Sequence, residues 1–229
     1  MPRRLGAIVA VAFGVSLSVI DSVIANVALP TLAAEFGTSS ANSVWIVNAY
    51  QLALITTLLI FSNLGDILGY RRIYISGLVL FTVASAGCAL STTFASLIAW
   101  RAVQGIGAAA ITSVNTTLIR IIYPRRMLAR GMGINATVVA VSSVAGPSVA
   151  AAILSVTTWH WLFAVNLPVG LIAFTLSSRF LPQNPVKVEG RRFDWRSGVM
   201  CALTFGLVMA CVEGYSHGMA LHVWFVLAA

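Results

Sequence analysis

The sequence predicts an all-α fold, a polytopic membrane helical bundle. Its 229 residues are 59% hydrophobic and only 9% charged, whereas soluble domains average about 45–50% apolar and about 25% charged residues. The apolar residues form runs of roughly twenty, the length that a helix needs to cross a hydrocarbon core of about 30 Å. Because this core offers no water to backbone groups, each run must be a helix.

Seven complete apolar runs follow one another along the chain. The expected spans are Leu5–Leu29, Val44–Leu64, Ile73–Leu90, Phe94–Leu118, Gly131–Leu154, Leu162–Leu181 and Gly198–Val212. A further run begins at Leu221 and stops at Ala229, which is too short to cross a bilayer. We therefore expect the chain to end inside an eighth span and to be a fragment of a longer protein.

One stretch of mixed charge and proline predicts the domain boundary. It covers residues 182–197 and separates the sixth run from the seventh. We expect a six-span bundle over residues 1–181, a cytoplasmic linker over 182–197, and an extra span with the start of the next over 198–229.

The distribution of Lys and Arg predicts a cytoplasmic amino terminus. Short cytoplasmic loops hold an excess of these residues. They occur before the first run and after the second, fourth and sixth, whereas the loops Pro30–Ser43, Ser91–Thr93 and Ser155–Trp161 contain none. The net charge of +8 is therefore a topology signal. No nucleic-acid-binding motif accompanies it, so we expect an inner (plasma) membrane protein whose surroundings are the lipid bilayer.

The cysteines and histidines do not predict an enzyme or a metal site. All three cysteines lie inside apolar runs and lack the spacing of paired metal ligands. The three histidines lie in or near outward loops, and no nucleophile, base and orienting group can be placed together. We expect neither catalysis nor a bound cofactor.

Asp21 is a charged residue inside the first run, where charge is costly and therefore suggests function. On a helix, Asp21, Ala25 and Leu29 stack on one face with Ser18 and Ser22 beside them, which suits a bundle interior or a wet cavity. Burial disfavours the charged form of a carboxylate, so Asp21 can exchange protons near neutral pH. The alternative is a structural acid that pairs with an arginine or caps a broken helix.

Arg101 is the charged residue inside the fourth run. A guanidinium keeps its proton, so in a membrane it needs acids, carbonyls or water around it. We expect Arg101 to bias a neighbouring carboxyl or to bind an anionic group; the alternative is an arginine tied to backbone carbonyls. Gln104, Gly105 and Ala108 follow it on a helix face that permits close packing.

The turn between the second and third runs carries Asp66, Gly69, Arg71 and Arg72. Glycine permits a tight turn, and the acid and the arginines can form charge-assisted bonds to a neighbouring helix. The pattern predicts a cytoplasmic latch that holds one conformation, or else an ordinary basic turn.

The fifth run contains Gly146 and Pro147 among many Ser and Ala residues. Proline removes a backbone hydrogen bond and kinks a helix, and small neighbours let another helix approach. We expect a kinked, closely packed helix that can gate or seal a cavity.

Together these segments resemble the major facilitator superfamily, and most closely its drug:proton antiporter branch with fourteen spans. Leu97–Ala109 matches the fourth-span motif of the family, Asp21–Pro30 resembles the first-span motif of this branch, and Trp159–Gly170 resembles the entry to its sixth span. Five residues depart from the family pattern, namely Val23, Ser62, Ile67, Ala150 and Ala151.

The resemblance implies one of two six-helix bundles around a central cavity, working by alternating access, with the carboxy-terminal half missing. Asp21 would be a proton or cation site, Arg101 part of the proton relay, and Asp66 with Gly69, Arg71 and Arg72 a cytoplasmic gate. Gly146-Pro147 would be the antiporter kink. Candidate substrate-cavity residues are Asn26, Asn48, Tyr50, Gln51, Gln104 and Asn115.

The expected function is therefore export of amphipathic or cationic small molecules, driven by the proton gradient without a cofactor. One alternative is an uptake symporter of another small solute, which the direction of proton-coupled flux distinguishes. The other is a non-transporting, truncated membrane fragment.

Overall fold

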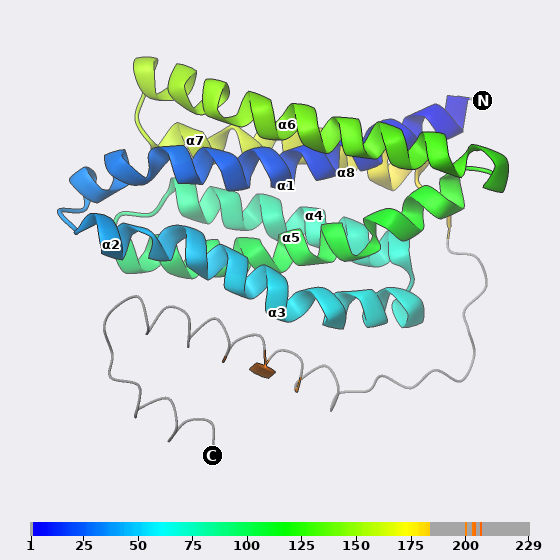
Figure 1. Ribbon diagram of the computed structural model, residues 1–229, viewed down its shortest axis with the longest axis horizontal. Helices are drawn as coiled ribbons and strands as arrows, with labels where there is room; N and C mark the ends of the chain where they lie inside the picture. The colour runs from blue at the N-terminus through cyan, green and yellow to red at the C-terminus, as the bar shows by residue number, and fades with distance from the viewer. Residues whose placement is uncertain (1, 184–199, 201–202, 205–206, 208–229) are drawn as a thin grey trace.

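Six membrane-length helices form one bundle in this computed structural model (Figure 1), which describes residues 2–183 and positions 200, 203, 204 and 207. This confirms the all-α fold and the first six predicted spans. The predicted seventh and eighth spans, and the linker beyond position 183, lie outside the described residues apart from those isolated positions. Within the described part of the chain, six helices are long and apolar enough to cross a membrane: Arg4–Glu35, Ser40–Leu68, Tyr70–Ala89, Phe94–Ile122, Arg125–Val156 and His160–Phe180.

The helices divide these six spans more finely. They are α1 (Pro2–Glu35), α2 (Ser40–Ser43), α3 (Trp45–Leu68), α4 (Tyr70–Ala89), α5 (Phe94–Ile122), α6 (Leu128–Val156), α7 (His160–Ala164) and α8 (Asn166–Phe180), with a 3₁₀ turn at Arg125–Met127. The first span is longer than predicted, because α1 continues through Pro30 instead of ending at Leu29. Membrane helices tolerate an internal proline where the freed carbonyl finds another partner.

The sixth span is interrupted at Val165, where α7 ends and α8 begins. Pro168 explains the interruption, because proline has no N–H and its ring crowds the carbonyl four residues earlier. That carbonyl belongs to Ala164, the last residue of α7. The break places Asn166 at the first position of α8.

The bundle consists of two sets of three long helices, and each set packs on the other. The first set is α1, α3 and α4, and the second is α5, α6 and α8. Helix α5 packs mainly on α3 and α4, while α1 packs mainly on α6 and α8, and α1 and α5 meet between them (Figure 1). The first long helix of each set thus lies against the second and third of the other set. This is the arrangement expected of two three-helix repeats.

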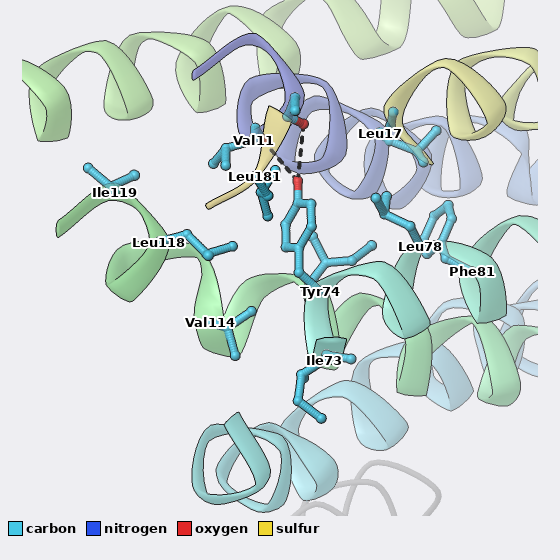
Figure 2. Packing of buried hydrophobic residues seen from close by; sticks show 14 of the residues in the cluster. Val11, Leu17, Ile73, Tyr74, Leu78, Phe81, Val114, Leu118, Ile119 and Leu181 are labelled. Carbon is cyan, nitrogen blue, oxygen red and sulfur yellow. Dashed lines mark hydrogen bonds between the residues drawn. The ribbon is translucent and has the colours of Figure 1, made fainter. Parts of the chain in front are cut away.

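Tyr74 joins α4 to α1 within the larger apolar core (Figure 2). It is fully buried, and its hydroxyl donates to the carbonyl oxygens of Ala10 and Val11, each at 3.2 Å. The buried side chains of Leu78, Phe81 and other core residues surround its ring. A buried hydroxyl needs such partners, because an unpaired polar group is costly away from water.

The bundle has an arginine-rich end, where α1, α4 and α6 begin and α3, α5 and α8 end. Arg4 donates from Nε to the Ile122 carbonyl at 2.8 Å, and Arg71 donates from Nη2 to the Ser178 carbonyl at 2.5 Å. These bonds join α1 to the end of α5 and α4 to the last turn of α8. The other arginines at this end are Arg3, Arg72, Arg120, Arg125, Arg126, Arg130 and Arg179.

We predict that Gly107→Ala destabilises the bundle. A Cβ at Gly107 would lie 2.7 Å from the backbone nitrogen and 2.9 Å from the Cα of Phe81 on α4. Backbone cannot move aside as a side chain can, so the expected loss is about 1–3 kcal/mol of unfolding free energy. Thermal unfolding of the purified full-length protein in detergent measures it.

Gly133→Ala is the matched control. It is also a helical glycine, but a Cβ there meets nothing within 4 Å, so the change should be neutral or stabilising by up to about 1 kcal/mol. Equal melting temperatures for the two variants would contradict the close packing of α4 on α5.

Candidate functional site: a buried carboxylate and its partners

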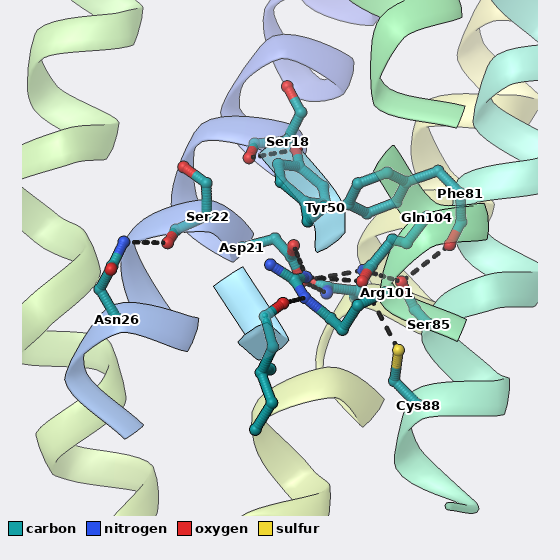
Figure 3. Close-up of polar contacts among 12 residues, drawn as sticks. Ser18, Asp21, Ser22, Asn26, Tyr50, Phe81, Ser85, Cys88, Arg101 and Gln104 are labelled. Carbon is teal, nitrogen blue, oxygen red and sulfur yellow. Dashed lines mark hydrogen bonds and ion pairs between the residues drawn. The ribbon is translucent and has the colours of Figure 1, made fainter. Parts of the chain in front are cut away.

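Asp21, Arg101 and Gln104 lie together in the interior of the bundle (Figure 3). Asp21 projects from α1, and the other two project from successive turns of α5; their exposed fractions are 1%, 0% and 0%. On α1, Ser18 and Ala25 are buried beside Asp21. The small and polar face predicted for this helix therefore does face the interior.

The three side chains form a closed ring of hydrogen bonds. Arg101 Nη1 donates to Asp21 Oδ2 and to Gln104 Oε1, each at 2.6 Å. Gln104 Nε2 donates to the other carboxylate oxygen, Asp21 Oδ1, at 2.9 Å. Both oxygens of Asp21 accept from donors, which is the bonding pattern of an ionised carboxylate.

Asn166 gives Asp21 a third donor, from α8. Its Nδ2 lies 2.6 Å from Asp21 Oδ1, and the residue is only 2% exposed. Asp21 Oδ1 thus accepts from amides on two helices, whereas Oδ2 faces the guanidinium. The carboxylate therefore links α1 directly to α5 and α8.

The ring is also fastened to α4. Gln104 Nε2 donates to Ser85 Oγ at 2.8 Å, and Cys88 Sγ donates to Gln104 Oε1 at 3.6 Å. Cys88 is a buried free thiol. Among the residues that the structure describes, no three His, Cys, Asp or Glu side chains are arranged to hold a metal ion.

Helix α3 encloses the guanidinium of Arg101. Arg101 Nε donates to the Ile46 carbonyl of α3 at 3.3 Å, and Arg101 Cζ lies 4.3 Å from the centre of the Tyr50 ring. The centre of the Phe163 ring, on α7, lies 5.7 Å from the same Cζ atom. Aromatic faces attract a cation, and more strongly where water is excluded. The ion pair and the groups around it therefore come from six helices, α1, α3, α4, α5, α7 and α8.

The candidate cavity residues do not lie in one place. Gln104 and Tyr50 are buried within the ring or against it, whereas Asn26 is exposed on the opposite side of α1 and bonds to its own helix at Ser22 (Figure 3). Gln51 is also exposed.

The two remaining cavity candidates lie on α3 and α5. Asn48 is half-buried on α3. Asn115 is buried nearer the arginine-rich end of α5, where its Nδ2 donates to Asn135 Oδ1 of α6 at 3.1 Å.

Sequence reasoning missed Asn166 and Ser85 as members of the site. Asn166 lies inside the Trp159–Gly170 stretch that resembles the sixth-span entry, but it was not among the predicted site residues. Its signal was available, since an amide inside an apolar span needs a hydrogen-bonding partner. Ser85 gave no comparable signal, because serine can bond to its own helix, as Ser85 Oγ does to the Phe81 carbonyl at 2.8 Å.

The predicted gate residues lie at the arginine-rich end. Asp66 Oδ1 accepts from the Tyr70 hydroxyl at 2.6 Å across Gly69, whose φ of 100° separates α3 from α4. Only glycine adopts this backbone conformation readily. Arg71 is half-buried and reaches α8, while Arg72 is exposed.

Gly146 brings α6 against α1 close to the site. A Cβ there would lie 2.7 Å from Val23 Cγ1, two residues beyond Asp21. Pro147 is exposed, and α6 runs through it without interruption. The close approach of α6 therefore depends on Gly146.

A comparison with protein families identifies this architecture. The profile of the Major Facilitator Superfamily matches residues 11–227. The chain belongs to this family of transporters.

Its relatives are also transporters. The chain is 53% identical over 221 residues to the "Uncharacterized transporter YebQ" of Escherichia coli, covering 96% of this chain and 48% of that protein. It is 30% identical over 214 residues to the "Putative multidrug resistance protein MdtD" of Salmonella typhi, covering 93% and 45%. The chain thus spans about half the length of the curated relatives it matches.

A solved transporter has the same fold. The crystal structure of the human organic anion transporter MFSD10 (TETRAN) superposes with a TM-score of 0.72 at 18% identity, covering 90% of this chain and 55% of that one. At this identity the match supports the fold alone.

We predict that Arg101→Met destabilises the protein by about 3–5 kcal/mol, because it leaves the buried Asp21 carboxylate without its cation. Adding Asp21→Asn should recover part of the loss, since the double variant leaves no unpaired charge. Chemical unfolding of the full-length protein in detergent measures both. A double variant no more stable than Arg101→Met would show that the ion pair does not hold the bundle together.

Proposed function

We propose that the chain forms the proton-coupling half of an exporter of amphipathic or cationic small molecules. The observation that carries this proposal is Asp21, the single acidic side chain that is buried among the described residues. Glu35 is exposed and Asp66 is only half-buried. Buried ionisable residues in membrane spans commonly mark ion or proton pathways.

Protonation of Asp21 supplies the coupling step in this proposal. Arg101 keeps its charge, so a proton can be taken up only at the carboxylate of the pair. Neutralising Asp21 removes its attraction for Nη1, now 2.6 Å away, and weakens the contact between α1 and α5. Two conformations that differ in this contact are then favoured by different charge states, as alternating access requires.

Two observations support an amphipathic substrate. A mostly apolar cleft of about 350 Å³ lies between α1, α6 and α8, within the size range of small-molecule sites. A relative at 30% identity carries a multidrug resistance name.

Export further requires an orientation, and we infer that the arginine-rich end faces the cytoplasm, because short cytoplasmic loops are rich in arginine.

We predict that Asp21→Asn in the full-length protein abolishes proton-coupled export. Asparagine imitates the protonated acid, a state that the cycle visits, so the variant should still fold but cannot release a proton. The measurement is efflux of a cationic dye from cells lacking their own pumps, with and without a protonophore.

Glu35→Gln is the matched control, since it also converts an acid of α1 to its amide but at an exposed position. It should export like the wild type. Gel filtration confirms that each variant is folded. Undiminished export by Asp21→Asn would refute the assignment, and proton-driven accumulation of the dye would identify an uptake symporter instead.

A further inference from the structure

We propose that Asn166 is a positioning residue that holds Asp21 in its ionised, helix-linking form, so that proton uptake by Asp21 depends on the start of α8. The inference deepens the proposed function and rests on Asp21 being the site that takes up the proton. It assigns a role to a residue outside the Asp21–Arg101 pair.

The geometry singles out Asn166 among the neighbours of Asp21. Its Nδ2 lies as close to the carboxylate as the guanidinium of Arg101 does, at 2.6 Å. Among the described residues, it is the side chain of α8 that bonds to this ring. An amide donor stabilises an ionised carboxylate more than a protonated one.

Charged and titratable groups around Asp21 come from other helices. Arg101 faces it from α5, Tyr50 from α3 and Cys88 from α4. Helices α6, α7 and α8 each carry one titratable side chain, and all of these lie at helix ends: Arg130, His160 and Arg179. Asn166 therefore acts on Asp21 through its amide, without a charge of its own.

The position of Asn166 allows this contact to be made and broken. It follows the interruption at Val165, and both residues line the apolar cleft of about 350 Å³ beside α1 and α6. Movement of the first turn of α8 would change the distance to the carboxylate, and with it the ease of protonation.

The test follows protonation of Asp21 directly, in the purified full-length protein. The infrared band of the protonated carboxyl is identified as the one absent from Asp21→Asn, and its intensity is recorded against pH. Asn166→Leu removes the donor at similar volume, so the protonated band should persist to higher pH than in the wild type. Asn166→Ala, which adds no bulk, serves as a second donor-free variant.

Two variants separate the amide from simple packing. Asn166→Gln keeps an amide donor and should return the midpoint towards the wild-type value. Asn42→Leu makes the same substitution at an exposed position of α2 and should leave it unchanged. An unmoved midpoint in both donor-free variants, or a midpoint in Asn166→Gln as high as in Asn166→Leu, overturns the proposal.

The infrared titration and the efflux assay test the two proposals separately, so either proposal can be refuted without the other. A shifted Asp21 titration with proton-driven efflux intact in Asp21→Asn would refute the proposed function and keep the positioning role. Loss of coupling in Asp21→Asn with no shift in the Asn166 variants would do the reverse. A parallel alkaline shift in the pH dependence of efflux by Asn166→Leu supports both.

Discussion

The ion pair between Asp21 and Arg101 is the interaction on which the rest of the bundle depends. The two residues lie on α1 and α5, each of which packs on two helices of the other three-helix set. One pair therefore joins the two sets at their centre. Because water is excluded there, each charge is costly without the other, and the surrounding hydrogen bonds must satisfy the atoms that the pair leaves over.

Small residues allow the helices to come close enough for that pairing. Gly105 of α5 lies against the backbone carbonyl of Tyr50, with no room for a Cβ. This contact also brings the Tyr50 ring beside the guanidinium of Arg101. Gly146 likewise lets α6 approach α1 closely, at Val23 next to Asp21. The lean helix faces visible in the sequence thus determine where the polar groups meet.

The sequence was sufficient for the first six spans, for the interior position of Asp21 and for the need of Arg101 for a partner. It did not identify Asp21 as that partner, because the relative depth of helices 80 residues apart is set by packing. The cavity prediction grouped Asn26 with Asp21 by polarity. Five residues along a helix correspond to about 140° of rotation, which explains why Asn26 lies on the opposite side of α1.

The kinds of partner around Asp21 matter as much as their number. A guanidinium only donates, so Arg101 could still bond to the carbonyl oxygen of a protonated Asp21, but it cannot accept from the new O–H, and the attraction between opposite charges is lost. The amides of Gln104 and Asn166 both donate to Oδ1, so a proton added at Oδ2 leaves these two bonds in place, although weaker than to the ionised carboxylate. Protonation would then weaken the link from α1 to α5 at Oδ2 while the amides keep contact at Oδ1. A site with one cationic partner and two neutral amide partners can thus respond to charge without losing its structure.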